Sequence, residues 1–194
     1  MEEKLKTITL SNPLLSHFKT DFESIPFDKI KSKHFIPAIK KGINLALDNI
    51  RLICNNADKP TFENTNLALE SCGSILGRNS SILFNLNSAE TNDEIQLITS
   101  QAAPLLTKFQ NDINLNEVLF DRIRYVYENT DETNLNTEQK TLLEKQYKGF
   151  VRNGALLDKK EKKKLRIIDA KLAKLSLSFG QNVLAETQAY ELHI

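Results

Sequence analysis

The sequence contains few of the residues that staple or interrupt a small protein: two cysteines, six glycines and five prolines among 194 residues. So few cysteines exclude a disulfide scaffold, and so little glycine and proline excludes collagen-like or long flexible tracts. Cys54 and Cys72 each lie in a helical pattern and have no CxxC neighbour. They are predicted to be reduced, buried side chains of a protein in a reducing compartment.

Neither sign of charge dominates, and no long hydrophobic run is present. Lysine and arginine total 26 against 25 aspartates and glutamates, which gives a formal net charge of +1. Such a balance provides no net field that would attract nucleic acid or an anionic membrane. No run approaches the roughly 20 apolar residues of a membrane-spanning helix, and residues 1–10 lack the apolar core of a signal peptide. We therefore expect a cytoplasmic protein with no nucleic-acid partner and no membrane partner.

Histidine is also scarce, and this bears on catalysis. The three histidines, His17, His34 and His193, lie far apart, and the HExxH motif of helical zinc sites is absent. The nucleophile motif GxSxG and the phosphate-binding motifs GxGxxG and GxxxxGK are absent as well. The histidines are interpreted as an arm residue, a helix-start residue and a strand or linker residue. The residues themselves thus predict no catalytic, cofactor-binding or metal-binding side chain.

Three weaker signals each have a functional and a structural interpretation. Gly73 and Gly77 could belong to a phosphate-binding loop, but their spacing favours a close approach between two helices. The lysine run at 159–164 could bind nucleic acid, but it lacks interleaved aromatic residues and favours a solvated helix start. The carboxylates that could act as general acids or bases are scattered: Glu63, Glu70, Glu117 and Glu144.

Apolar residues recur at helical spacing from His34 onward. Before that point Pro13 and Pro26 interrupt any helix, so we expect an extended arm lying on the body. The arm's residues available for packing are Phe18, Phe22, Ile25 and Phe27. A first helix is predicted from near His34, with Pro37 tolerated in its first turn. Its apolar face is Ile36, Ile39, Ile43, Leu47, Ile50 and Cys54.

Two further helices are predicted in the middle of the chain. The second begins at Thr61, which can cap it, and continues to about Asn87 as one element. The third begins with a capping box formed by Thr91 and Glu94, and Pro104 is expected to kink it.

Three more helices complete the predicted fold. The fourth and fifth carry Leu119, Ile123, Val126 and Leu143, Tyr147, Phe150, and Gly154 is a left-handed stop. The sixth begins with a capping box formed by Asp158 and Glu161. It continues with an unbroken apolar stripe: Leu165, Ile168, Leu172, Leu175, Phe179 and Val183.

Six amphipathic helices without a clear strand before residue 188 predict an all-α bundle. We expect an extended N-terminal arm over 1–30, a helical domain over 31–188, and the start of a linker or strand over 189–194. The sequence stops there without a cap, which is typical of a longer chain that has been cut.

Five blocks of sequence, in the same order, are similar to one family of peptidases. The first is NPLLSHFKTDFESIPFDKIKSKHFIPAI from Asn12, followed by PTFENTNLALE at 60–70 and FNLNSAETN at 84–92. The last two are LLEKQYKGFVRNGALL at 142–157 and LAKLSLSFGQNVLAET at 172–187. Together they span almost the whole chain and resemble the N-terminal region of the thimet-oligopeptidase family. The peptidyl-dipeptidase branch is the nearer one, chiefly through FDKIKSKHF, FVRNGA and FGQNVLAET.

The resemblance implies the N-terminal lobe of a two-lobed, mainly helical zinc peptidase with a deep channel for short unfolded peptides. In that family HExxH and a later glutamate hold the zinc, and none of these positions exists here. The resemblance therefore implies a channel wall and an inactive isolated chain. It also implies that zinc belongs to the full-length parent, and that the C-terminal catalytic part of the same chain is a partner.

Two alternatives stay open at the level of sequence. A free-standing helical module that binds peptides or proteins without catalysis would have the same pattern of helices. The end of the sixth helix, with Val183, Leu184 and residues 190–194, is expected to be exposed in this chain. Two copies could then pair through that surface.

Overall fold

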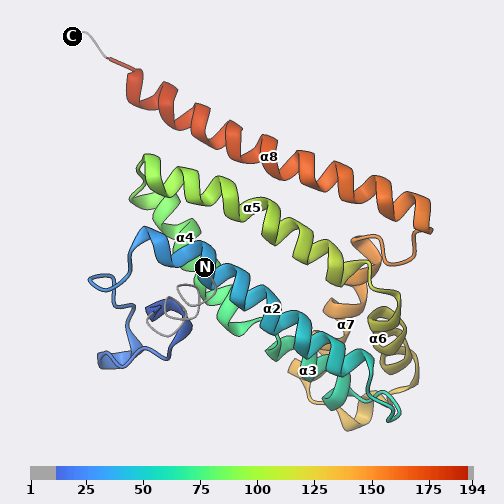
Figure 1. Cartoon of the computed structure of the whole chain (residues 1–194). Helices are drawn as coiled ribbons and strands as arrows, with labels where there is room; N and C mark the ends of the chain where they lie inside the picture. Colours follow the sequence, from blue (N-terminus) through green and yellow to red (C-terminus); the bar gives the residue numbers. More distant parts are fainter. Residues whose placement is uncertain (1–11, 192–194) are drawn as a thin grey trace, which may run out of the picture.

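The computed structural model describes residues 12–191, and every regular element in that range is helical (Figure 1). The longer helices are α2 (Phe35–Cys54), α4 (Ser74–Ala89), α5 (Asp93–Asn114), α6 (Glu117–Asn129), α7 (Thr137–Arg152) and α8 (Lys159–Ala189). Between and before them lie α3 (Ala68–Ser71), a π-helical turn η4 (Phe62–Leu67), and the 3-10 turns η1 (Pro13–Leu15), η2 (Asp21–Glu23), η3 (Ser32–His34) and η5 (Glu132–Asn134). The predicted all-α fold is confirmed.

Residues 12–34, before α2, form only short 3-10 turns and contact the body near both ends of the segment. Leu14 and Phe18 are buried in the core cluster formed by α2, α4 and α5. Arg78 of α4 donates hydrogen bonds to the carbonyl oxygens of Leu14 (2.8 Å) and Ser16 (3.1 Å). At the second end Ile30 packs against the core and His34 is buried. The expectation that the remaining arm residues pack as well is wrong. The large apolar side chains exposed here are Phe22, Ile25 and Phe27.

Helix α2 is the central element, and its predicted face is confirmed. Ile39 and Ile50 are buried, and Pro37 lies in the first turn as expected. At Gly42 a β-carbon would lie only 3.1 Å from the Cα atom of Leu76 on α4. Glycine is therefore what allows α2 and α4 to approach so closely.

The predicted second helix is divided in the structure. Thr61 caps η4 by accepting a hydrogen bond from the backbone N–H of Asn64, as expected. The helix then ends after Ser71, and α4 begins at Ser74. The reason is Gly73, whose φ of −109° and ψ of 10° depart from helical values. Glycine is among the weakest helix formers, so a break is least costly there.

The beginning of α5 also differs from the prediction. Asn92, not Thr91, is the N-cap, and its side chain accepts a hydrogen bond from the N–H of Ile95. The helix continues without interruption through Pro104. Asparagine and threonine are both good N-caps, so the spacing of the motif alone could not choose between them.

The last three helices follow their predicted limits closely. Asn116 and Asn136 cap α6 and α7, and Gly154 ends the turn after α7 with a φ of +91°. Asp158 and Glu161 form the predicted capping box at the start of α8. Tyr190 and Glu191, the described residues beyond α8, do not form a strand, and 192–194 lie outside the described residues.

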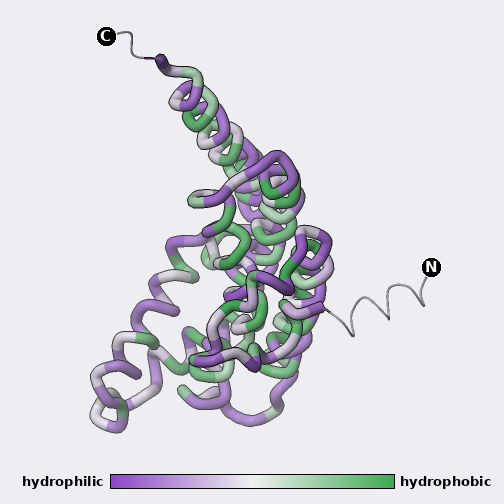
Figure 2. The backbone as a smooth tube through the Cα atoms, turned by 90° about the vertical axis from the view of Figure 1, so that its left-hand side faces the viewer, coloured by the Kyte–Doolittle hydropathy of each residue, from purple (hydrophilic) through white to green (hydrophobic). Residues whose placement is uncertain are grey.

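The core lies within α2 to α7 and excludes α8. One cluster joins the N-terminal segment with α2, α4 and α5. A second joins the C-terminal ends of α2 and α5 with α3, α6 and α7. A third joins η4 with α6 and α7. None of the three clusters of buried residues contains a residue of α8. Helix α8 lies along α5 at the edge of the body, and its C-terminal end extends beyond it (Figures 1 and 2).

Candidate functional site

The two histidines within the described residues, His17 and His34, do not share a metal site. His17 is exposed, with Nε2 3.4 Å from a carboxylate oxygen of Glu23. His34 is buried, and its Nδ1 accepts a hydrogen bond from the backbone N–H of Lys31 at 3.0 Å. Burial, together with the charges of Lys33 and Lys31, holds the pKa of His34 below its usual value. His193 lies outside the described residues. Within residues 12–191 no three His, Cys, Asp or Glu side chains are grouped closely enough to hold a metal ion.

The cysteines occupy structural positions. Both are free and half-buried beside the core cluster that contains Ile50 and Phe120. Burial raises the pKa of the Cys54 thiol, and a hydrogen bond from Asn116 opposes the shift without cancelling it. Burial alone raises the pKa of Cys72. Because the thiolate is the reactive form, raised pKa values make both cysteines poor nucleophiles at neutral pH.

The glycine interpretation is wrong. No atom of another segment lies within 4 Å of a β-carbon built at Gly73 or Gly77, so neither residue allows a helix to approach. That role belongs to Gly42. The four-residue spacing could not reveal this, because Gly73 lies outside the helix that contains Gly77.

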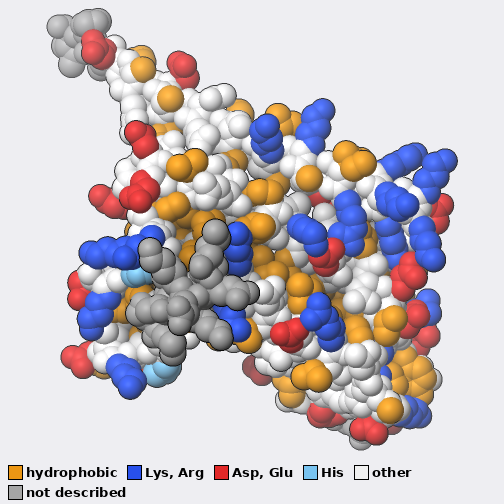
Figure 3. All heavy atoms as spheres, viewed as in Figure 1, with side chains coloured by type: hydrophobic (Ala, Val, Ile, Leu, Met, Phe, Trp, Pro, Cys, Tyr) orange, Lys and Arg blue, Asp and Glu red, His pale blue; other side chains and the backbone are white. Residues whose placement is uncertain are grey.

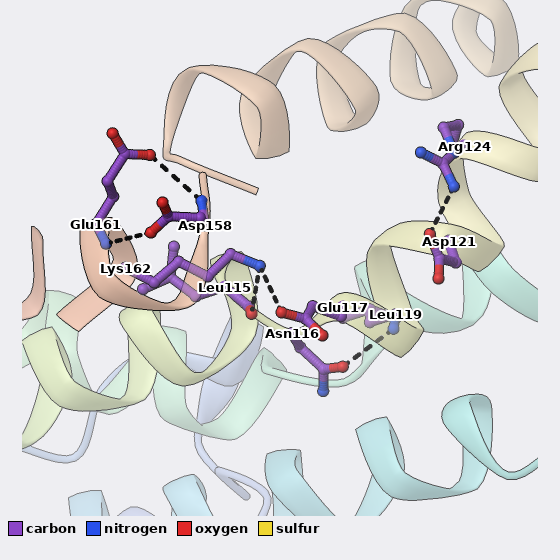
Figure 4. Close-up of polar contacts among 9 residues, drawn as sticks. All are labelled: Leu115, Asn116, Glu117, Leu119, Asp121, Arg124, Asp158, Glu161 and Lys162. Atoms are coloured by element: carbon purple, nitrogen blue, oxygen red, sulfur yellow. Dashed lines mark hydrogen bonds and ion pairs between the residues drawn. The ribbon is translucent and has the colours of Figure 1, made fainter. Parts of the chain in front are cut away.

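The lysine run is a solvated helix start with one exception. Its other lysines are exposed, but Lys162 is buried and extends along α8 toward α6. Its Nζ donates to the carbonyl oxygen of Leu115 (3.4 Å) and lies 3.3 Å from a carboxylate oxygen of Glu117 (Figure 4). Of the other scattered carboxylates, Glu70 accepts a hydrogen bond from Gln146, Glu144 pairs with Lys148, and Glu63 is exposed.

The inner side of α8 contacts the body through both polar and apolar side chains. Arg166 donates to a carboxylate oxygen of Asp112 at 2.7 Å, and Lys162 makes the contacts just described. Leu165 packs on the turn at Gly154, where a β-carbon would be 2.7 Å from its Cδ2 atom. Farther along, the half-buried positions recur every three or four residues: Asp169, Ala173, Leu177, Gln181 and Leu184. Lys162 is nevertheless the one residue of α8 that is buried.

The outer side of α8 carries most of the stripe that the sequence predicted to be a packing face. The exposed fractions are 59% for Ile168, 58% for Leu172, 56% for Leu175, 71% for Phe179 and 49% for Val183. Six of the sixteen exposed large hydrophobic side chains within residues 12–191 lie on α8, whereas the others are dispersed over the rest of the surface. We call Ile168, Leu172, Leu175, Phe179 and Val183 the outward face of α8.

The expected exposure near the end of α8 is only partly right. Val183 and Tyr190 are exposed as predicted, but exposure begins much earlier, at Ile167. Leu184, expected to be exposed, is half-buried. It lines a groove of about 370 Å³ between α8 and the α4–α5 turn. The polar lining of this groove consists of Asn87, Ser88, Thr91, Gln96, Ser176 and Gln181. None of its lining residues is charged, so the groove offers hydrogen bonds but no general acid or base.

Together these features define a helical domain whose longest helix presents an apolar face to solvent. No helix within residues 12–191 combines the length and the hydrophobicity needed to cross a membrane.

Comparison with known proteins identifies the family. The chain is 34% identical over 179 residues to the dipeptidyl carboxypeptidase of Salmonella typhimurium, covering 92% of this chain and 26% of that protein. It is 34% identical to the dipeptidyl carboxypeptidase of Escherichia coli over 182 residues, 94% of this chain and 27% of that protein. Identity to oligopeptidase A of Escherichia coli is 29% over 181 residues, 93% of this chain and 26% of that protein. No family model matches the chain.

The chain therefore belongs to the dipeptidyl carboxypeptidase and oligopeptidase A family, and it corresponds to the N-terminal region of those proteins. It spans about a quarter of the length of the curated relatives that it matches.

Proposed function

We propose that this chain is the N-terminal, non-catalytic lobe of a zinc-dependent peptidase that hydrolyses short peptides. The observation that carries the proposal is the 34% identity to two dipeptidyl carboxypeptidases over more than nine-tenths of the chain. The lobe comprises residues 31–188, with an arm over 1–30 and a linker beginning at 189–194. Its two free, half-buried cysteines suit a cytoplasmic protein.

Zinc does not fit the residues of this chain. A catalytic zinc needs three protein ligands around one open position, and the described residues contain no such group. Nor does the sequence contain the HExxH motif that the resemblance implies. We therefore assign zinc, and the chemistry of peptide hydrolysis, to a C-terminal catalytic part of the same polypeptide.

The role proposed for the lobe itself is steric. Resemblance to the family implies a channel between two lobes, and a wall of that channel must keep its shape while it excludes folded proteins. Two features support this proposal, because each fixes the packing of the lobe: the close contact of α2 with α4, and the hydrogen bonds from Arg122 to the loop before η4. Selection by peptide length then needs no charged residue from the wall.

The experiment that tests the proposed function is an exchange of lobes. Residues 12–191 of this chain would replace the matching N-terminal part of the dipeptidyl carboxypeptidase of Escherichia coli. The chimera should release dipeptides from the C-terminus of a short peptide with a kcat/KM within about tenfold of the intact enzyme. The control is the same enzyme with that part deleted, which should be inactive. A chimera that unfolds cooperatively but cleaves no peptide would contradict the proposed function.

A further inference from the structure

The outward face of α8 has the dimensions of a helix-packing surface. Ile168, Leu172, Leu175, Phe179 and Val183 follow each other at steps of three or four, so their side chains lie along one side of the helix. From the first to the last the face is about 22 Å long at 1.5 Å per residue. Apolar residues at this spacing normally pack against a second layer of protein.

The contacts on the inner side of α8 also indicate that the outward face is an interaction surface. An amphipathic helix at the edge of a body usually packs with its apolar side inward and leaves its charges in water. Here the inner side carries Lys162, Arg166 and Asp169 together with the half-buried Leu165, Leu177 and Leu184. The five apolar residues of the outward face are nevertheless exposed. Exposed apolar surface of this kind, gathered on one element, marks an interaction site.

The charges beside the outward face indicate the chemistry of what covers it. Six lysines in the first half of α8 are exposed: Lys159, Lys160, Lys163, Lys164, Lys171 and Lys174. At about 100° per residue, Lys164 and Lys171 lie beside the outward face, whereas Lys159, Lys163 and Lys174 lie on the opposite side of the helix. The second half, residues 175–189, has Glu186 as its one charged side chain. Figure 3 shows basic side chains gathered over the N-terminal half of α8, whereas hydrophobic, uncharged and some acidic side chains lie toward its other end. A complementary surface would be acidic opposite the first half and apolar opposite the second.

We propose that the outward face of α8 is the surface on which the catalytic part of the same polypeptide packs, through an apolar strip with acidic residues beside its first half. This inference rests on the proposed function. About three-quarters of the length of each relative lies outside the region that this chain matches, so a covering layer of ample size exists in such a protein.

A second copy of the chain fits the same face less well. In an antiparallel pair Lys164 and Lys171, which lie beside the face, would be opposite residues 175–189, where Glu186 is the one carboxylate. In a parallel pair the lysines would face one another, and like charges opposed across an interface are unfavourable. Charge complementarity therefore favours the catalytic part over self-association.

The test compares the solvent accessibility of side chains by oxidative footprinting in the 194-residue chain and in the chimera described above. Phe179 and Leu172 should be labelled readily in the chain alone and at least about fivefold less in the chimera. Leu52 is the internal reference, because it is 72% exposed, against 71% for Phe179, and lies on α2 away from the face. Equal labelling of Phe179 and Leu172 in both proteins would overturn the proposal.

Matched substitutions provide the second arm. Leu172→Asp and Leu97→Asp change side chains that are both 58% exposed, one on the outward face and one on α5. In the chain alone neither substitution should change the unfolding midpoint appreciably. In the chimera Leu172→Asp should lower kcat/KM at least about tenfold and restore labelling of Phe179, while Leu97→Asp stays within about twofold. Equal effects of the two substitutions would overturn the proposal.

The outcomes separate this inference from the proposed function. A chimera that is inactive but protects Phe179 would leave the packing surface intact and contradict the proposed function. A chimera that is active but leaves Phe179 fully labelled would support the proposed function and contradict the packing surface. In the chain alone, Phe179 could become protected as the protein concentration rises. That result would identify a second copy as the occupant of the outward face and would overturn the proposal that the catalytic part packs there.

Discussion

At the scale of single residues, Arg122 fixes the loop between α2 and η4. It is buried, and its guanidinium donates to the carbonyl oxygens of Asn56 (2.8 Å) and Asp58 (3.4 Å) and to the side-chain oxygen of Asn64 (3.2 Å). The guanidinium of Arg122 thus donates hydrogen bonds to three acceptors that would otherwise accept them from water. Arg122 is the buried partner, whereas Asn56 and Asn64 are half-buried and Asp58 is exposed. Its loss therefore removes hydrogen bonds from a charged donor, which contribute about 1.5–3 kcal/mol each.

Arg122→Met should therefore lower the free energy of unfolding by about 2–4 kcal/mol. The matched control is Arg124→Met on the same helix, where an exposed arginine pairs with Asp121. Such surface pairs contribute at most about 1 kcal/mol. Urea denaturation followed by circular dichroism gives both values, and equal losses for the two variants would mean that the loop is held by other contacts.

Gly154 is a second position where a single substitution is expected to change the stability of the protein. Its φ of +91° is in the range that favours glycine, and a β-carbon there would lie 2.7 Å from Leu165 and 2.9 Å from Leu157. Gly154→Ala should destabilise the protein by about 1–3 kcal/mol. Gly149→Ala, in the open interior of α7, should instead stabilise it by up to about 1 kcal/mol. Thermal unfolding distinguishes them by sign, and stabilisation by both would contradict the conformation of the turn.

At the scale of elements, the attachment of α8 to α5 depends on Asp112. Burial alone would raise the pKa of this carboxyl, but hydrogen bonds from Lys108 and Arg166 outweigh burial and hold the pKa below its usual value. A carboxyl whose pKa is lowered by folding stabilises the folded state above its unfolded pKa, about 3.9. That contribution is lost as the pH falls through the lower pKa of the folded state.

The stability of wild-type protein should accordingly exceed that of Asp112→Asn at pH 7, and the difference should shrink as the pH falls below about 4. Urea denaturation across this pH range measures it. The control is Asp48→Asn, an exposed carboxylate paired with Arg51 on α2, which should cost little at any pH. A gap between wild type and Asp112→Asn that is constant from pH 7 to about pH 2 would show that the ion pair does not anchor α8.

Helices could be predicted from the sequence wherever a cap and an apolar period agreed. Asp158 with Glu161 located the start of α8, and Gly154 the end of the preceding turn. The break at Gly73 was missed because the apolar period continues on both sides of it. Hydrophobic spacing locates a face on a helix, but whether that face packs against the body depends on the other helices.

Helix α8 is an example, because hydrophobic spacing alone did not predict which of its sides packs against the body. Its stripe was correctly located, but it was expected to need cover near its C-terminal end, whereas most of its length is open to solvent. A sign was present in the sequence, since Lys162, Arg166 and Asp169 recur at helical spacing on another side. That pattern could be recognised as an inner side only once Asp112 and Glu117 were placed beside it.

At the scale of the whole molecule, the all-α fold could be predicted from the sequence, and the family followed from five blocks of similarity. The exposed apolar face of α8 could not be predicted from the sequence. It depends on which surface a core of α2 to α7 leaves uncovered, and this is a property of packing between elements far apart in the chain.

The most direct test of the central claim is an assay of the purified 194-residue chain for bound zinc and for peptide cleavage. The account predicts far less than one zinc per chain after dialysis and no cleavage of a short peptide, with or without added zinc. The dipeptidyl carboxypeptidase of Escherichia coli serves as the positive control. One tightly held zinc per chain, together with cleavage that a chelator abolishes, would contradict the assignment of this chain as a non-catalytic lobe.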